Sequence, residues 1–191
     1  MRRRPTLLLV KHSLPEVVPA IPAREWTLSQ AGRQRCQALA EKVKPYLPDV
    51  VLSSLEPKAI ETAEIVAREL SLPCRTFEGL HEQDRTGMGY LEREQFETKV
   101  RDLFKQPDEW VLGRETARQA RQRFSQALRL VETEYPENNI LVVAHGTVIT
   151  LFVEQMTDRE PFPFWRSLGL PSFVVFSLPE HKLLRTVESV L

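Results

Sequence analysis

Short, continuous apolar runs recur along the chain and predict strands that are buried on both faces of a sheet. The runs lie at residues 6–10, 49–54 and 140–144, with two later ones at 173–176 and 182–187. The first and third runs end at His12 and His145. Pro179 and Glu180 separate the last two runs, which indicates a hairpin.

Between these runs, apolar residues recur with the 3.6-residue period of amphipathic helices. The stripes predict helices near residues 28–43, 57–70, 117–135 and 147–156. Thr27 and Gln30 have the spacing of a capping box at the start of the first helix, and Pro57 suits the first turn of the second. Strands that alternate with helices predict an α/β fold, a three-layer α/β/α sandwich with a mostly parallel central sheet.

We find no repeat, low-complexity tract or clear linker in the sequence. We therefore expect residues 1–191 to form a single domain. Residues 79–110 are the least regular part of the chain, and we interpret them as an insertion over the edge of the sheet. Trp26, Tyr90, Phe96 and Trp110 lie in the loops and would either form an apolar wall of a site or cover the sheet edge.

Composition excludes several classes of protein. The chain of 191 residues has 26 basic and 26 acidic residues, so no net charge attracts it to nucleic acid or to an anionic membrane. Arg2, Arg3 and Arg4 precede an apolar run that is too short for a secretory signal or a membrane helix, so we expect a cytoplasmic protein. Cys36 and Cys74 lie among apolar neighbours, and we interpret both as small buried residues.

Two histidines occupy equivalent positions in the predicted sheet. His12 and His145 each follow an apolar strand, at the edge where open α/β sheets bind ligands. Ser13 and Gly146 follow them, and such small residues let backbone amides approach an anion. Either histidine alone would be read as a structural residue, but two at matching positions indicate a site.

Two lysines join the histidines. Lys11 directly precedes His12, and Lys58 lies at the start of the helix that follows the second strand. Taken alone, Lys58 would be an exposed lysine at a helix start. Two imidazoles and two ammonium groups suit a phosphate monoester, because the cations offset charge on the phosphoryl oxygens. A metal site that also used Glu82 and Asp84 is disfavoured, because both lysines would repel a cation.

Six segments in order along residues 7–155 resemble the histidine phosphatase superfamily, which includes the cofactor-dependent phosphoglycerate mutases. The segments are Lys11-His12-Ser13, Leu28-Ser29-Gln30-Ala31-Gly32, Ser53-Ser54-Leu55 with Lys58-Ala59-Ile60-Glu61-Thr62-Ala63, Leu80-His81-Glu82, Glu115-Thr116 with Arg123, and Ala144-His145-Gly146. Each segment is weak alone, whereas six in register make the resemblance specific. It implies a phosphoglycerate mutase-like fold.

The resemblance also implies a mechanism. His12 would attack phosphorus and become a phosphohistidine, Glu82 would act as general acid and then as base, and His145 would stabilise the transferring phosphoryl group. No metal or cofactor is implied. We expect Glu82 to lie beside an apolar wall that raises the pKa of its carboxyl group.

The sequence departs from the family in its phosphate-binding residues. Lys11 and Lys58 stand where the family has arginines, and Ser13 stands where it has a glycine; Gly146 keeps the pattern. Lysine retains the charge but loses the bidentate fork. Arg24 or Arg85 would supply a guanidinium instead, or be a surface residue. We expect Lys11 and Lys58 to approach one anion, and their mutual repulsion to lower the pKa of at least one.

Three functions follow from this sequence. The leading prediction is a phosphatase that acts on a small phosphorylated metabolite or a phosphoprotein. A non-catalytic phosphate-binding or scaffold protein and a phosphoglycerate mutase are the alternatives. Arg114, Arg118 and Arg121 share one predicted helix face, which we interpret as solvated rather than as a nucleic-acid site. The oligomeric state stays open, a homodimer included.

Overall fold

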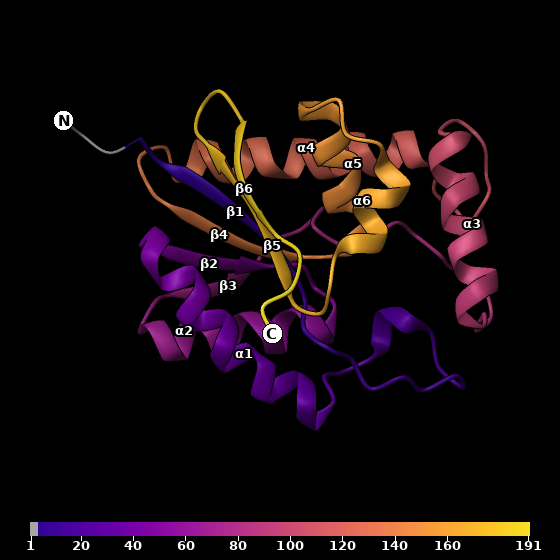
Figure 1. Cartoon of the computed structure of the whole chain (residues 1–191), viewed down its shortest axis with the longest axis horizontal. Coiled ribbons are helices and arrows are strands. Elements are labelled where there is room, and N and C mark those ends of the chain that lie inside the picture. Colours follow the sequence, from indigo (N-terminus) through magenta and orange to yellow (C-terminus); the bar gives the residue numbers. More distant parts are fainter. Residues whose placement is uncertain (1–3) are drawn as a thin grey trace.

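A central sheet of six strands organises residues 4–191, the part of the chain that the computed structural model describes (Figure 1). Arg2 and Arg3 of the basic N-terminal run lie outside the described residues. The strands are β1 (Thr6–Lys11), β2 (Val50–Ser53), β3 (Cys74–Thr76), β4 (Ile140–Ala144), β5 (Ser172–Ser177) and β6 (Lys182–Val187), arranged in the order β3-β2-β4-β1-β5-β6. Strands β3, β2, β4 and β1 are parallel, and β5 and β6 form the expected antiparallel hairpin.

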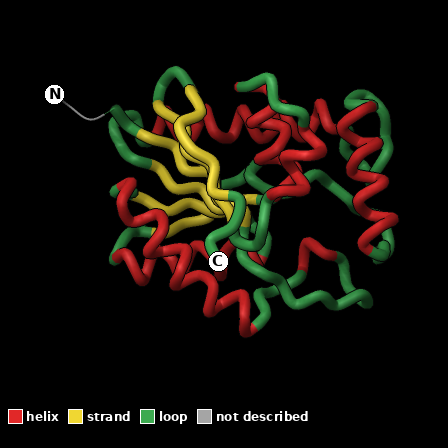
Figure 2. The backbone as a smooth tube through the Cα atoms, viewed as in Figure 1, coloured by secondary structure: helices red, strands yellow, loops and turns green. Residues whose placement is uncertain are grey.

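Helices cover both faces of the sheet, as Figure 2 shows. They are α1 (Gln30–Val43), α2 (Pro57–Leu70), α3 (Arg93–Lys105), α4 (Ala117–Glu134), α5 (Gly146–Met156) and α6 (Pro161–Ser167), with short 3-10 turns η1 (Ala23–Glu25) and η2 (Lys44–Tyr46). Helices α1 and α2 pack on one face, while α4 and α5 pack on the other, with α3 and α6 beyond them. The predicted α/β sandwich with a mostly parallel sheet is confirmed.

Alternation along each strand separates two hydrophobic cores. In β1, Leu8 and Val10 belong to the core under α1 and α2, whereas Leu7 and Leu9 belong to the core under α4 and α5. All four side chains are fully buried. Because successive side chains in a strand point to opposite faces, one continuous apolar run supplies both cores. This explains why the strand that carries His12 reads as uninterrupted hydrophobic sequence.

The predicted capping box at the first helix is wrong. Ser29, not Thr27, is the N-cap of α1, and its hydroxyl accepts a hydrogen bond from the Gly32 amide at 3.0 Å. Gly32 packs against the backbone of Leu14, where a Cβ atom would lie 2.1 Å from the carbonyl oxygen. The capping box is instead at α4, where Thr116 and Gln119 exchange both hydrogen bonds.

Three further expectations are corrected. Residues 79–110 are not irregular throughout, because they contain α3, which buries Val100, Leu103 and Phe104. Cys36 is buried as expected, but Cys74 is exposed because β3 is the outer strand of the sheet and all its residues are exposed. Arg114 precedes α4, so it does not share a helix face with Arg118. Among residues 4–191, no helix is both long and apolar enough to cross a membrane.

Candidate active site

The sheet brings His12 and His145 together. Strands β1 and β4 are parallel neighbours with Lys11 opposite Ala144, so the two histidines that follow these positions leave the sheet side by side. The amide of His12 donates to the carbonyl of Ala144 at 3.0 Å, which continues the strand pairing by one residue. The two ring centroids lie 5.2 Å apart at an angle of 60°. One phosphoryl group can therefore contact both imidazoles.

Hydrogen bonds fix the orientation of both rings. His12 Nδ1 lies 2.7 Å from the Ser13 carbonyl oxygen, which can only accept, so Nδ1 carries the hydrogen and Nε2 keeps its lone pair. His145 Nε2 lies 2.7 Å from Ser54 Oγ and 3.4 Å from a carboxylate oxygen of Glu56. Within residues 4–191, His145 Nδ1 is buried without a hydrogen-bond partner.

Both imidazoles are neutral near pH 7. Burial is the largest cause, and it lowers the pKa of His145 to about 4 even though Glu56 acts in the opposite direction. Burial, together with the electrostatic influence of the neighbouring His145 and Lys58, places the pKa of His12 well below its usual value. A neutral His12 with a free Nε2 lone pair is the state that a nucleophile requires.

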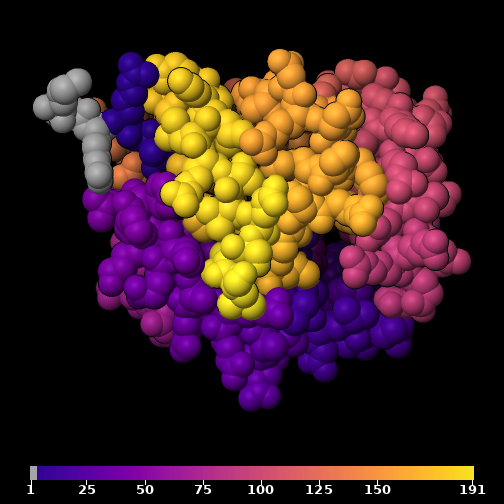
Figure 3. Space-filling view, in the orientation of Figure 1, coloured from indigo at the N-terminus to yellow at the C-terminus, as the bar shows by residue number. Residues whose placement is uncertain are grey.

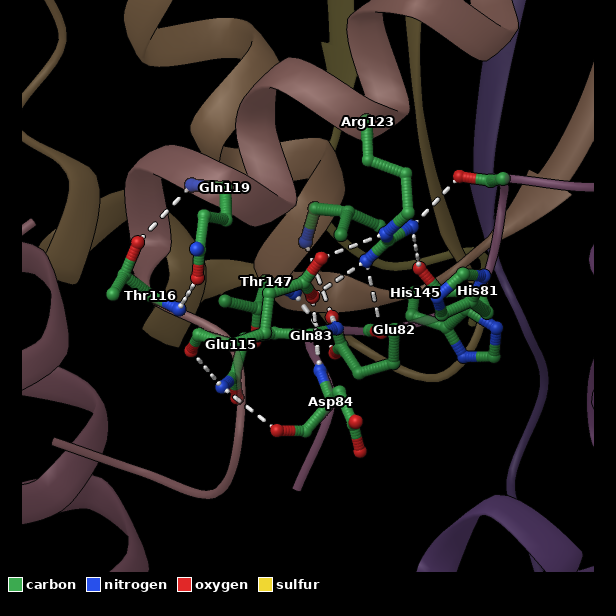
Figure 4. Close-up of polar contacts among 12 residues, drawn as sticks. His81, Glu82, Gln83, Asp84, Glu115, Thr116, Gln119, Arg123, His145 and Thr147 are labelled. Atoms are coloured by element: carbon green, nitrogen blue, oxygen red, sulfur yellow. Dashed lines mark hydrogen bonds and ion pairs between the residues drawn. The ribbon is translucent and has the colours of Figure 1, made fainter. Parts of the chain in front are cut away.

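Glu82 lies at the N-terminus of α5, the helix that begins directly after His145. Its two carboxylate oxygens accept from the amides of Thr147 and Val148 at 3.1 and 3.2 Å, and Arg85 lies 3.3 Å away. Figure 4 shows Glu82 and Thr147 close together. Burial would raise the pKa of this carboxyl group, but Arg85, His145 and the backbone amides lower it to about 2. The expected raised pKa is therefore wrong, because Arg85 first, and the amides at the helix terminus in addition, favour the carboxylate.

The loop that carries Glu82 is held by Arg123 of α4. Its guanidinium donates to the carbonyl oxygens of Gly79, His81 and Glu82 at 2.7, 2.9 and 3.2 Å, and Glu115 pairs with it at 2.8 Å. Figure 4 shows Arg123 among His81, Glu82 and Glu115. The ion pair between Glu115 and Arg123 gives a structural reason for the segment Glu115-Thr116 with Arg123, one of the six that resemble the family. The guanidinium of Arg123 thus satisfies three carbonyl groups of an irregular loop and fixes the position of Glu82.

Gln83 further anchors this loop. Its side-chain amide donates to the carbonyl groups of Leu112 and Glu115, the latter at 2.7 Å. Gln83 is almost fully buried, and it was not identified from the sequence. Its position directly after Glu82 is the one signal that could have indicated a structural role.

Lys11 reaches from the end of β1 towards Glu82. Its ammonium group donates to the Leu168 carbonyl at 2.7 Å, and its side chain lies against Gly146, where a Cβ atom would be 3.2 Å from Lys11 Cε. Burial lowers the pKa of Lys11 to about 8, with Glu82 acting upwards and Arg85 downwards. A lowered pKa was expected, but burial and Arg85 cause it rather than repulsion from Lys58.

Lys58 is buried and already paired. Its ammonium group donates to a carboxylate oxygen of Glu56 at 2.5 Å and to the Ala23 carbonyl at 2.7 Å. Glu56 was not identified from the sequence, although an acidic residue between a buried strand and a helix is a signal that could have found it. The Ala23 contact also ties Lys58 to the proline-rich loop at residues 14–26.

Three further residues were expected in the site: Arg85, Arg24 and Ser13. Arg85 belongs to the site, because it contacts Glu82, donates to the Thr147 hydroxyl at 2.8 Å and stacks on Phe96. Arg24 is exposed and donates to Thr86 at 3.0 Å, so it links two loops. The amide and hydroxyl of Ser13 donate to Thr62 and to the Gly32 carbonyl, which leaves neither free for an anion.

An aromatic group from α3 and α6 lies next to the site. The Trp165 ring is 5.8 Å from that of Phe96 and 6.0 Å from that of Phe162, and Trp165 Nε1 would be 3.3 Å from a Cβ atom at Gly146. Figure 3 shows the α3 and α6 segments and the proline-rich loop on one side of the molecule. Phe96 therefore belongs to an apolar wall, whereas Tyr90 and Trp110 are exposed.

Titratable side chains in the described part of the chain do not form a metal site. No group of three or more His, Cys, Asp or Glu side chains among residues 4–191 is arranged to hold a metal ion. In addition to burial, Lys58 and Lys11 lower the pKa of His12, and Lys58 and Arg85 lower that of His145. Three cations therefore lie close to the two imidazoles, which suits an anion. The charges and the two imidazoles together define a candidate site for phosphoryl transfer.

Comparison with known proteins agrees with this chemistry. The sequence profile of the histidine phosphatase superfamily (branch 1) matches residues 21–183, so the chain belongs to this family. The matched segment begins after His12, whose pairing with His145 is therefore an independent observation. In sequence, the chain is 27% identical over 134 residues to the uncharacterized phosphatase PhoE of Bacillus subtilis. That segment is 70% of this chain and 66% of the relative, just under two thirds of its length.

Solved structures share the fold at low sequence identity. YhfR of Bacillus stearothermophilus superposes with a TM-score of 0.76 at 20% identity, covering 96% of both chains. A phosphoserine phosphatase of Entamoeba histolytica, in complex with 3-phosphoglyceric acid, gives a TM-score of 0.77 at 17% identity, covering 96% of this chain and 97% of the other. A mycobacterial glucosyl-3-phosphoglycerate phosphatase with inorganic phosphate gives 0.76 at 20%, covering 98% and 99%.

Proposed function

We propose that the protein is a phosphatase that hydrolyses a phosphate monoester through a phosphohistidine on His12. The observation that carries the proposal is the His12–His145 pair, whose ring centroids lie 5.2 Å apart at the ends of adjacent parallel strands. The free Nε2 of His12 and the nearby carboxylate of Glu82 supply a nucleophile and a proton carrier. Membership of the histidine phosphatase superfamily supports the same chemistry.

In the first step, the Nε2 lone pair of His12 attacks phosphorus. The bond between phosphorus and the ester oxygen breaks, its electron pair stays on that oxygen, and Glu82 gives the departing alcohol a proton. Since the pKa of Glu82 is about 2, this proton must arrive with the substrate. A singly protonated phosphate ester brings it, and negative charge beside the carboxylate raises the pKa of Glu82 so that it accepts the proton.

In the second step, water attacks the phosphohistidine. Glu82, now a carboxylate, takes a proton from the water while the phosphorus–nitrogen bond breaks and its electron pair returns to Nε2. Inorganic phosphate leaves with the proton from Glu82 as the monoanion, so His12 is neutral and Glu82 is a carboxylate again. His145, Lys11, Lys58 and Arg85 stabilise the charge on the phosphoryl oxygens in both steps.

The two lysines replace the phosphate-binding arginines of the family in this proposal. A lysine is a mobile point charge and does not fix two oxygens as a guanidinium does. Arg85, which lies within 3.3 Å of Glu82, restores one guanidinium to the site. The substrate that fits best is a small phosphorylated metabolite, the class to which the names of the phosphoserine and glucosyl-3-phosphoglycerate phosphatases refer.

A non-catalytic phosphate-binding protein is the second candidate. This candidate is favoured because charged groups of the site already have partners: Lys58 is paired with Glu56, and Glu82 accepts hydrogen bonds from α5. A binder would retain affinity for phosphate without forming a covalent intermediate. Turnover and binding therefore separate the two functions.

Hydrolysis of p-nitrophenyl phosphate by wild type and by His12→Ala tests the leading proposal. We expect turnover in the wild type, its loss in His12→Ala, and trapping of an acid-labile phosphoenzyme only in the wild type. Phosphate binding without His12-dependent turnover would favour the second candidate. An assay of 3-phosphoglycerate isomerisation distinguishes a mutase from a phosphatase.

Glu82→Gln tests the proton carrier. We expect a large loss with alkyl phosphates, whose leaving alkoxide needs a proton, and a smaller loss with p-nitrophenyl phosphate, whose leaving group does not. Equal losses on the two substrates would contradict a general-acid role for Glu82.

A further inference from the structure

Glu56 occupies a helix N-cap position without capping the helix. It precedes α2, and its side chain makes no capping hydrogen bond. The amide of Lys58 instead donates to the Trp26 carbonyl at 3.1 Å, which satisfies one of the free donors of the first turn. The carboxylate of Glu56 is thus available for contacts elsewhere, and it is turned into the candidate active site.

Three groups of that site meet the Glu56 carboxylate. One oxygen accepts from the Lys58 ammonium group at 2.5 Å, and the other accepts from the Glu82 amide at 2.9 Å and lies 3.4 Å from His145 Nε2. Only 8% of Glu56 is exposed. A buried carboxylate that touches a phosphate-site lysine and the second histidine is itself part of the electrostatics of the site.

The charged groups around Glu56 come from every neighbouring element. Lys11 lies on β1, Lys58 on α2, and Glu82 and Arg85 on the loop before α3, while His12, His81 and His145 are the titratable imidazoles. Below about pH 8, where Lys11 is charged and the imidazoles are neutral, three cations and two carboxylates give a net charge of 3 − 2 = +1. Without the Glu56 carboxylate, the net charge would be +2.

We propose that Glu56 is a positioning residue that holds Lys58 and His145 and makes the site favour the singly charged form of a phosphoryl group over the doubly charged form. This inference deepens the proposed function and rests on it. A monoanion makes the buried site neutral, whereas a dianion leaves it with a charge of −1. Because uncompensated charge is costly in a buried site, the dianion binds only together with a proton.

The same arrangement supplies the proton that the chemistry needs. A substrate that binds as the monoanion, or as the dianion with a proton taken from solvent, brings one proton into contact with the Glu82 carboxylate. Glu82 then holds it for the leaving alcohol. Replacing Glu56 by a neutral residue would let the dianion bind without that proton. The affinity for the dianion would then rise, and the supply of protons to Glu82 would fall.

Calorimetric titration with inorganic phosphate tests the proposal without any turnover. In two buffers of different ionisation enthalpy at about pH 8, Lys11, whose pKa is about 8, contributes proton uptake in both proteins, so we expect the wild type to take up about one proton per phosphate more than Glu56→Gln does. Between about pH 5.5 and about pH 8, the affinity of the wild type for phosphate should fall. The ratio of the affinity at about pH 5.5 to the affinity at about pH 8 should be about tenfold smaller in Glu56→Gln than in the wild type.

Two variants serve as controls. Glu69→Gln removes an exposed carboxylate from the same helix and should leave proton uptake unchanged. Glu56→Asp keeps the charge and should retain the uptake. Equal proton uptake by wild type and Glu56→Gln, or a uniform loss of affinity at both pH values, would overturn the proposal. Absence of proton uptake in the wild type would overturn it even if Glu56→Gln does not fold.

Failure of this inference is distinguishable from failure of the proposed function. Proton uptake on phosphate binding involves no attack on phosphorus, so it can be measured in His12→Ala as well. If that variant binds phosphate with Glu56-dependent proton uptake but the wild type shows no turnover, the inference about Glu56 stands and the phosphatase proposal fails. If the wild type turns over without Glu56-dependent uptake, the phosphatase proposal stands and the inference about Glu56 fails.

Discussion

Acid should destabilise the folded protein through His145 well before its carboxylates are protonated. In the folded state, burial holds the pKa of His145 at about 4, whereas in the unfolded chain it returns to 6.5. The unfolded state therefore binds more protons in this range, and the free energy of unfolding rises with pH. The contribution of His145 is fully present above about pH 6.5 and is lost as the pH falls towards 4.

The size of the effect follows from the two pKa values. A difference of about 2.5 pKa units corresponds to about 3 kcal/mol, of which about 2 kcal/mol is lost between about pH 7.5 and about pH 5. Glu56 and Glu82, whose pKa values fall from 4.5 to about 2, contribute stability that is lost mainly below about pH 4.5. Histidines therefore dominate the upper interval.

Urea unfolding at these two pH values measures the difference directly. We expect His145→Gln to lose about 2 kcal/mol less stability than the wild type between them, because glutamine has no proton to gain. The surface variant Glu69→Gln should behave as the wild type does. Identical losses in His145→Gln and wild type would refute the argument that a buried neutral His145 sets the acid stability.

Three further substitutions have defined outcomes. The pKa of Lys11 is about 8, so kcat/KM should fall above about pH 8 as the ammonium group loses its proton, and Lys11→Arg should move this decline to higher pH in a pH–rate profile. Arg123→Ala frees three carbonyl groups of the Glu82 loop and should lower kcat about ten- to a hundredfold in steady-state kinetics. Gly32→Ala places a Cβ atom 2.1 Å from the Leu14 carbonyl oxygen and should lower the free energy of unfolding by about 1–3 kcal/mol in urea titrations.

The strands and the histidine pair were predictable because strand topology determines them. A continuous apolar run that ends in histidine specifies both a buried strand and the edge of the sheet at which the side chain emerges. His12 and His145 therefore follow from the sequence. Helix α3 was not predicted from the sequence, although it buries Val100, Leu103 and Phe104 on one face.

The electrostatics of the site were less predictable. Glu82 was expected to have a raised pKa, but which backbone amides meet its carboxylate depends on the direction of α5 in three dimensions. Glu56 was missed because an acidic residue before a helix is ordinarily a cap, and only its side-chain rotamer turns it into the site. Sequence therefore specified the types of group present better than the contacts among them.

Register between β1 and β4 has an evolutionary consequence. His12 and His145 are both buried, and the spacing of adjacent strands sets the distance between them. Two segments border the site: residues 14–26, whose Ala23 carbonyl accepts from Lys58, and residues 86–92 before α3, whose Thr86 accepts from Arg24. Insertions and substitutions in those segments can change which alcohol the site accepts while leaving the reacting pair in place, so one scaffold can acquire new substrates without reinventing its chemistry.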